Sequence, residues 1–145
     1  MITFTQAPKE ETEKISQLLK KNNLPVSDLR ESAIVFFVAK KDRTLIGCIG
    51  LEKYGKDGLL RSFAVDNEYW NLGIGKEMYN RLLKYSQKNG IKTLHLLTNT
   101  AKDYFLKTGF SVTHRDNAPV EISKSREFEG LCPVTSTYMI LDILS

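Results

Sequence analysis

The chain has 145 residues, of which 41% are hydrophobic, 10% aromatic and 26% charged. This length and composition fit one domain, over residues 1–145, and exclude disordered, collagen-like and coiled-coil chains. No apolar stretch approaches the roughly 20 residues of a membrane span, and Met1–Lys9 lacks a signal peptide's apolar run. Two cysteines, Cys48 and Cys132, are too few for a disulfide framework. We therefore expect a soluble cytoplasmic protein that is not bound to a membrane.

The charge balance is mildly basic. Lys and Arg number 21 against 17 Asp and Glu, a formal net charge of +4. The charges alternate in sign along the chain, and no basic stripe interleaves with aromatic residues. This pattern favours an anionic small molecule over nucleic acid as the binding partner.

Alternating and helical hydrophobic patterns organise the first half of the chain. Ile15, Leu18 and Leu19 repeat at helical spacing, and IVFFVAK (34–40) is dense in β-branched and aromatic residues, which is typical of a buried strand. The predicted elements are a strand over Ile2–Gln6, a helix over Glu10–Lys21, a short helix over Ser27–Ser32, and strands over Ile34–Lys40, Leu45–Glu52 and Leu59–Val65.

The last two of these strands are predicted to form a hairpin, because Asp-Gly lies between two apolar runs. A two-residue turn centred on Lys56-Asp57 or on Asp57-Gly58 shifts the strand partners by two residues and leaves the faces unchanged. Either turn places Glu52 on the same face as Arg61, Phe63 and Val65. A bulged three-residue loop would reverse this.

In the second half, apolar residues from Ile74 onwards mark a helix that runs to about Asn89, with Gly90 as its cap. The further predicted elements are strands over Thr93–Thr98, Phe110–His114 and Thr135–Leu141, a helix over Ala101–Thr108 and a short helix within Pro119–Leu131. A hairpin series followed by a strand–helix–strand crossover requires a mixed sheet with helices on its faces.

The most informative segment is the strand that ends at Val65, followed by Trp70–Lys76 at the head of the long helix. Backbone N–H groups at a helix N-terminus point together, and the helix dipole attracts anions there. Gly73 and Gly75 allow a phosphate to approach the backbone, although glycines that only make a tight turn are the alternative. A Rossmann third glycine is missing at Met78, and no P-loop pattern occurs.

Two motifs resemble the GCN5-related N-acetyltransferase (GNAT) family. Trp70-Asn71-Leu72-Gly73-Ile74-Gly75 is similar to R/Q-x-x-G-x-G/A, and Ala101-x-x-Tyr104-Phe105-x-x-x-Gly109-Phe110 is similar to A-x-x-F-Y-x-x-x-G-F. The order of strands and helices also agrees over nearly the whole chain. The resemblance implies an α/β (α+β) fold with a mixed, mostly antiparallel sheet, flanked by helices and splayed between its fourth and fifth strands.

The resemblance further implies that acetyl-CoA is the co-substrate. Its pyrophosphate is expected on the backbone N–H groups of Asn71, Leu72, Gly73, Ile74, Gly75 and Lys76. The strand edge formed by Phe63, Ala64 and Val65 is expected to pair with the pantetheine amides. The N–H near Val65 is expected to stabilise the developing oxyanion, and Asn99 and Phe105 to lie beside the cofactor.

The sequence departs from the family pattern at two positions. Trp70 replaces the usual Arg or Gln, and Lys76 is a candidate for the compensating charge. Phe105 stands where many members carry a tyrosine acid, and its neighbour Tyr104 points about 100° away on a helix. We therefore expect either no dedicated tyrosine acid or water in that role, because a thiol with a pKa of about 8.5 leaves acceptably as thiolate.

Glu52 is the first candidate for the base that deprotonates the attacking amine, oriented by Arg61 across the hairpin. The alternative is a solvent-exposed Glu52–Arg61 pair of little energetic weight. His95 lies among apolar residues and is interpreted as a core histidine. If transfer depends mainly on positioning of the amine, no strong base is needed.

The segment from Ser125 to Met139 is similar to a stretch, R/E-F-x-x-L-C-P-x-S-A-x-x-M, in the arsenic-resistance-associated N-acetyltransferase subgroup, with Thr137 in place of the Ala. Arg126 and Ser136 are the acceptor-side candidates there, together with Arg61 and Glu52. An arginine at such a place can clamp a carboxylate. Cys132 alone is a poor soft-metal ligand, so no metal is expected.

These features favour direct transfer of acetyl from acetyl-CoA to a primary amine of a small, amino-acid-like molecule. Two alternatives stay open, namely a non-catalytic CoA-binding sensor and an acetyltransferase for protein N-termini or lysines. The resemblance also implies a homodimer, for which Thr135–Leu141 is a plausible edge strand.

Overall fold

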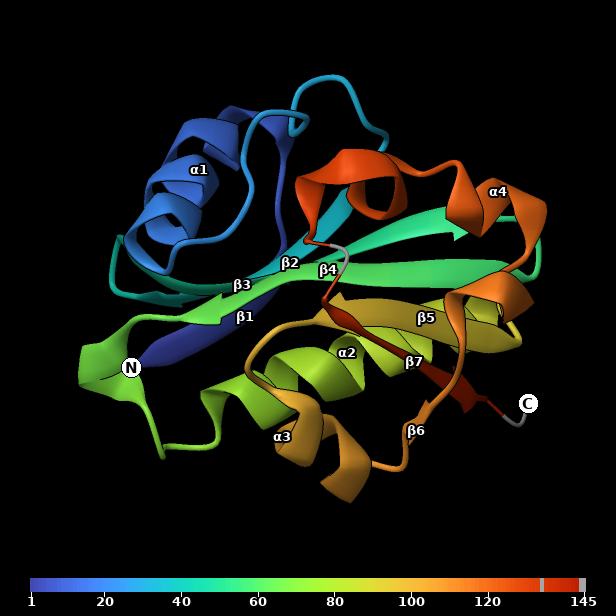
Figure 1. Ribbon diagram of the computed structural model, residues 1–145. Helices are drawn as coiled ribbons and strands as arrows, with labels where there is room; N and C mark the ends of the chain where they lie inside the picture. Colours follow the sequence, from blue (N-terminus) through green and yellow to red (C-terminus); the bar gives the residue numbers. More distant parts are fainter. Residues whose placement is uncertain (134, 144–145) are drawn as a thin grey trace. The chain divides into compact units, whose positions relative to one another are not determined.

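A computed structural model describes residues 1–133 and 135–143 of the chain (Figure 1). The chain divides into two compact units, the first made of residues 1–52 and 60–85 and the second of residues 53–59 and those from 86 onward. The expectation of one domain over residues 1–145 stays a prediction. Val134, Leu144 and Ser145 lie outside the described residues.

Within the described residues, seven strands take part in hydrogen-bonded pairing. They are β1 (Ile2–Gln6), β2 (Val35–Lys41), β3 (Thr44–Tyr54), β4 (Asp57–Val65), β5 (Thr93–Thr98), β6 (Ser111–Val112) and β7 (Thr137–Asp142). The α-helices are α1 (Thr12–Lys21), α2 (Ile74–Lys88), α3 (Lys102–Lys107) and α4 (Val120–Ser123). Shorter turns of helix are η1 (Lys9–Glu11), η2 (Asn67–Tyr69), η3 (Arg115–Asn117) and η4 (Glu127–Leu131).

The strand order is β1-β2-β3-β4-β5-β7-β6. The β1–β2, β2–β3, β5–β7 and β6–β7 pairs are antiparallel, whereas β4 and β5 are parallel. The parallel register joins only Asp57–Leu59 of β4 to Thr93–His95 of β5. The predicted mixed, mostly antiparallel sheet flanked by helices is therefore confirmed.

In the first unit, α1 and α2 cover opposite faces of the strands (Figure 1). Phe36 and Val38 of β2 belong to the cluster that buries the apolar stripe of α1. The residue between them, Phe37, has its ring 5.5 Å from that of Tyr85 on α2. This alternation follows from the two-residue period of a strand, so β2 packs against both helices.

In the second unit, α3 ends in a glycine turn that accounts for one of the sequence motifs. Gly109 has φ 105°, a conformation that only glycine adopts without strain. The turn lets the Phe110 N–H donate to the Phe105 carbonyl at 3.0 Å, and the two rings pack edge to face 5.4 Å apart. Glycine and phenylalanine therefore occur at the end of that motif because they close the helix.

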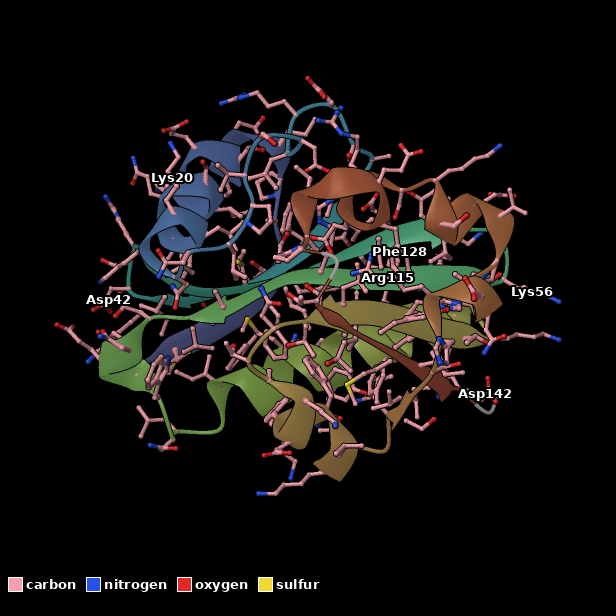
Figure 2. All side chains as sticks on the ribbon, in the orientation of Figure 1. Lys20, Asp42, Lys56, Arg115, Phe128 and Asp142 are labelled. Carbon is pink, nitrogen blue, oxygen red and sulfur yellow. The ribbon has the colours of Figure 1, made fainter. Side chains whose placement is uncertain are left out.

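The C-terminal part of the second unit packs through aromatic rings. Figure 2 labels Arg115 and Phe128, whose guanidinium carbon and ring centroid are 5.7 Å apart. Phe128 in turn packs edge to face on Tyr138 of β7, with 5.1 Å between centroids. These contacts attach η3 and η4 to the β7 strand.

Several predicted boundaries are corrected by the structure. Residues 27–32 form turns and not a helix, although the Ser32 N–H donates to the Asp28 carbonyl at 2.9 Å, as in one helical turn. A first turn of helix is costly to form, and only further turns recover that cost. The hairpin turn lies at Gly55-Lys56, one residue earlier than the nearer of the two expected positions, and this shift by itself leaves Arg61 on the face of Glu52.

The other corrections concern the C-terminal strands. The sixth predicted strand shrinks to Ser111–Val112. The last strand starts at Thr137, after a turn in which the Ser136 N–H bonds to the Pro133 carbonyl. It lies between β5 and β6 in the strand order, so the expectation that it forms an edge is wrong.

Leu19 of α1 is fully buried in the first unit, and Leu19→Ala is expected to lower the free energy of unfolding by about 2–5 kcal/mol. The neighbouring Lys20→Ala, on the exposed side of the same helix, should stay within about 0.5 kcal/mol of the wild type. Urea unfolding followed by circular dichroism measures both. Equal values for the two variants would contradict the packing of α1 described above.

Candidate acetyl-CoA and acceptor site

A left-handed residue interrupts the regular backbone in the middle of strand β4, as in a β-bulge. Ser62 has φ 54°, in the left-handed region that non-glycine residues seldom occupy. Its backbone carbonyl accepts a hydrogen bond from Cys48 Sγ at 3.3 Å, and its Oγ accepts one from Arg61 Nε at 3.1 Å. Partners on both sides of the residue therefore hold the strained conformation in place.

The bulge reverses the side-chain alternation that the hairpin predicts. Arg61 keeps the face of Glu52, as expected, because Arg61 Nη1 lies 2.9 Å from Glu52 Oε2. After Ser62 the side-chain alternation shifts by one residue. Ala64 therefore belongs to the core cluster that contains α1, and Phe63 packs against α2. The expectation that Phe63 and Val65 share the face of Glu52 is therefore wrong, and a bulge within the strand is the cause.

The loop between β4 and α2 presents backbone N–H groups. Asn71 and Gly73 have φ of 65° and 78°, both left-handed, and α2 begins at Ile74. The first helical bond runs from the Glu77 N–H to the Gly73 carbonyl at 3.1 Å. The N–H groups of the first helical turn have no acceptor within the helix, so this end is able to bind an anion.

Two close contacts shape this loop. A Cβ at Gly75 would lie 3.4 Å from the Phe63 ring and 3.8 Å from a Val65 methyl group, so glycine lets α2 start close to β4. Trp70 places its indole Nε1 2.7 Å from the Val65 carbonyl oxygen while 58% of the residue stays exposed. The Trp in place of the family's Arg or Gln therefore ties the loop to the end of β4.

Glu52 and Arg61 are buried, in contrast to the exposed pair considered from the sequence. Their side chains are 5% and 0% exposed, and a third group, Asp28, lies with them. Arg61 bonds to both carboxylate oxygens of Asp28, with Nη1–Oδ2 and Nη2–Oδ1 distances of 2.6 Å. The structure therefore contains a buried network of two carboxylates and one guanidinium.

Burial opposes ionisation of Asp28, but hydrogen bonds from Arg61 and Ser32 outweigh it, so the pKa of Asp28 is lowered from its usual value. Sequence reasoning missed Asp28 because it lies in a turn, 33 residues from Arg61. The signal that could have found it is Arg61 itself. A buried arginine needs acidic partners for its charge, and Asp28, in the short helix predicted over Ser27–Ser32, was one of the available candidates.

In the second unit, Ser136 Oγ donates to Asn99 Oδ1 at 2.9 Å, so one predicted acceptor residue bonds to one predicted cofactor residue. Arg126 is exposed at the start of η4. Phe105 is buried in α3, whereas the adjacent Tyr104 is 40% exposed. The two neighbours thus point in different directions, as their helical spacing predicts.

A hydrogen-bonded chain of three polar side chains also lies in the second unit. His95 is 3% exposed, its Nδ1 lies 2.7 Å from the Tyr138 hydroxyl, and its Nε2 lies 2.8 Å from Asp57 Oδ1. Burial, with a smaller effect from Asp57, raises the pKa of Tyr138 to about 12, so the phenol stays protonated. The interpretation of His95 as a core histidine with both nitrogens bonded is confirmed.

The model of the acetyltransferase (GNAT) family matches residues 3–110, well over half of the chain. The chain belongs to the GNAT family. Over 86 residues, 58% of this chain, it is 31% identical to the amino-acid acetyltransferase of Pseudomonas syringae pv. syringae. That match covers 20% of the Pseudomonas protein, so the chain corresponds to only part of this relative.

Solved GNAT-like structures have the same fold. N-acetylglutamate synthase from Neisseria gonorrhoeae, complexed with coenzyme A and N-acetyl-glutamate, matches at TM-score 0.82 and 18% identity over 100% of this chain and 36% of its own. A Mycobacterium tuberculosis protein in complex with CoA matches at TM-score 0.80 and 22% identity, over 98% of this chain and 99% of its own. These similarities confirm the GNAT fold that the sequence motifs imply.

No helix among residues 1–133 and 135–143 is both long and apolar enough to cross a membrane. In the same part of the chain, no group of three or more His, Cys, Asp or Glu side chains is arranged to hold a metal ion.

The hydrogen-bonded chain through His95 should contribute to stability. Tyr138→Phe leaves His95 Nδ1 without its buried partner and should lower the free energy of unfolding by about 1–3 kcal/mol. The exposed Tyr104→Phe is the matched control and should change it by less than about 0.5 kcal/mol. Urea unfolding compares them, and equal stability of the two variants would show that the chain contributes nothing.

Proposed function

We propose that this protein transfers an acetyl group directly from acetyl-CoA to the primary amine of a small, amino-acid-like molecule. The proposal rests on the backbone conformation at the end of β4 and in the loop that follows it. There, left-handed Asn71 and Gly73 lead into the first turn of α2 in a chain of the GNAT family. The two relatives named above, an amino-acid acetyltransferase and an N-acetylglutamate synthase, support the acceptor class.

Acetyl-CoA is proposed to bind along β4 and the following loop. The amides of residues 71–76 would hold the pyrophosphate, because they combine backbone donors with the positive end of α2. Lys76, exposed in the first turn of the helix, would add positive charge. The backbone edge of Phe63–Val65 would pair with the pantetheine, and Asn99 and Phe105 keep the cofactor-binding roles that the resemblance implies.

The proposed reaction passes through a tetrahedral intermediate. The amine nitrogen attacks the thioester carbonyl, a C–N bond forms, and the negative charge on oxygen is stabilised by the Val65 N–H. The C–S bond then breaks, coenzyme A leaves as a thiolate, and the proton from nitrogen passes to a base. Glu52 is the proposed base, reached directly or through water.

No tyrosine acid is assigned to this reaction. Phe105 occupies the position where many family members carry a tyrosine, and it is buried among the rings of Tyr104 and Phe110. Tyr104 points to a different side of the helix, and burial raises the pKa of its phenol. A thiolate is an acceptable leaving group near neutral pH, so the reaction does not require an acid at this position.

On the acceptor side, Arg126 and Ser136 are proposed to contact the substrate in the second unit. Arg126 is exposed and can bind a carboxylate with two parallel hydrogen bonds. The stretch Ser125–Met139 supports membership of the arsenic-resistance-associated subgroup, which names an association and not a substrate. We further propose that the protein is a homodimer in the cytoplasm. Its interface does not use β7 as an edge strand, because β7 lies between β5 and β6.

Acetyl-CoA binding is expected to change the fluorescence of Trp70, the single tryptophan in the sequence, which lies in the proposed cofactor loop. Gly75→Val adds a branched side chain against Phe63 and should weaken binding by about tenfold or more. Lys88→Ala, at the exposed end of the same helix, is the matched control and should bind like the wild type. Fluorescence titration, checked by calorimetry, measures each affinity.

A wild type that binds NAD or ATP as tightly as acetyl-CoA would contradict the cofactor assignment. Binding of acetyl-CoA without turnover of any amine would instead favour the sensor alternative. Acetylation of peptides but not of amino acids would favour the protein acetyltransferase.

Glu52→Gln tests the base once an acceptor has been found in a panel of amino acids. The variant cannot take up the proton, so kcat should fall roughly 100-fold while the affinity for acetyl-CoA is retained. A pH–rate profile and calorimetry provide the two measurements. Unchanged kcat would show that water removes the proton and that Glu52 has another role.

A further inference from the structure

We propose that Asp28 is a positioning residue for acetyl transfer. It locks the Arg61 guanidinium, which in turn holds the Glu52 carboxylate, so Arg61 is not the clamp for an acceptor carboxylate. The inference rests on the proposed function, because it takes Glu52 as the group that faces the amine. It adds a residue that neither sequence motif contains.

The Asp28–Arg61 contact has the geometry of a rigid clamp. Two parallel bonds of 2.6 Å join the carboxylate to the two terminal nitrogens of the guanidinium, and both side chains are 0% exposed. Charge-assisted pairs of this kind fix the plane of the guanidinium as well as its distance. The orientation of Arg61 is therefore determined by Asp28.

The remaining donors of Arg61 are directed at the protein itself. Nη1 is shared between Asp28 Oδ2 and Glu52 Oε2, at 2.6 and 2.9 Å, and Nε donates to Ser62 Oγ at 3.1 Å. Of the five N–H groups of a guanidinium, four are accounted for by these contacts and the Nη2–Oδ1 bond. A substrate carboxylate that needs two parallel N–H groups would have to displace buried partners.

The turn that carries Asp28 is itself fixed. Ser32 Oγ donates to Asp28 Oδ2 at 2.7 Å, and the Glu31 and Ser32 N–H groups both donate to the Asp28 carbonyl, at 3.0 and 2.9 Å. The carboxylate is thus anchored at its backbone and at its side chain. A contiguous set of bonds leads from this turn, through Arg61, to Glu52.

The charges of the network point to the same role. Each of the two carboxylates, Asp28 and Glu52, forms an ion pair with the Arg61 guanidinium. A carboxylate beside the acceptor favours the acceptor's ammonium end and disfavours its carboxylate. The structure therefore assigns Glu52 to the amine and leaves the acceptor's anionic group to residues other than Arg61.

Asp28→Asn is the first test, because it preserves the shape of the side chain and replaces one oxygen with a donor that faces Arg61. With the best acceptor of an amino-acid panel, kcat should fall roughly 10- to 100-fold. The affinity for acetyl-CoA should stay within about twofold of the wild type, since the cofactor loop is untouched. Glu11→Gln is the matched control, because Glu11 also pairs with a cation, Lys40, in the first unit.

Arg61→Lys tests the second half of the proposal. Each active amino acid is compared with its α-carboxamide, and the ratio of their kcat/KM values should be the same in the variant and the wild type. A clamp on the carboxylate predicts instead that the variant loses the acid selectively and that its KM rises. That result would overturn the assignment of Arg61.

Ser32→Ala keeps the test decisive if Asp28→Asn does not fold, because it removes a single bond to the Asp28 carboxylate. A smaller fall in kcat, with acetyl-CoA affinity and the melting temperature retained, is then expected. Wild-type kcat in the folded Asp28 and Ser32 variants would overturn the positioning role and leave the proposed function intact. A wild type that acetylates no amine would overturn the proposed function, and this assignment with it.

Discussion

The buried charge of Arg61 is the constraint on which the first unit of this protein depends. A guanidinium removed from water must be compensated by acidic partners and by hydrogen bonds, or its desolvation would destabilise the fold. Asp28 and Glu52 supply the negative charge, and Ser62 accepts the bond from Nε. The turn after α1, the end of β3 and the middle of β4 are therefore joined by a single side chain.

The same network is linked to the shape of β4. Arg61 bonds to Ser62, whose left-handed backbone shifts the side-chain alternation by one residue. Phe63 and Val65 thereby face Gly75 at the start of α2, and the indole of Trp70 binds the carbonyl of Val65. The bulge thus separates the strand into a part that carries Arg61 and a part that leads into the loop before α2.

Much of the fold and of the candidate site could be predicted from the sequence, and the wrong predictions have physical causes. The glycine loop before α2 and the pairing of Glu52 with Arg61 follow from local pattern and hairpin register. The bulge at Ser62 does not, because a serine in a regular-looking strand carries no sign of a left-handed backbone. Asp28 was not predicted as a site residue for a different reason, because its role depends on a tertiary contact between a turn and a strand.

Hydrogen–deuterium exchange of the backbone amides, with and without acetyl-CoA, tests the proposed cofactor site most directly. If the cofactor's pyrophosphate is held by backbone N–H groups after β4, slowing of exchange should concentrate in residues 71–76, whose first-turn amides lack helical acceptors. If saturating acetyl-CoA leaves these amides unprotected and slows exchange elsewhere, the result would contradict pyrophosphate binding at this loop.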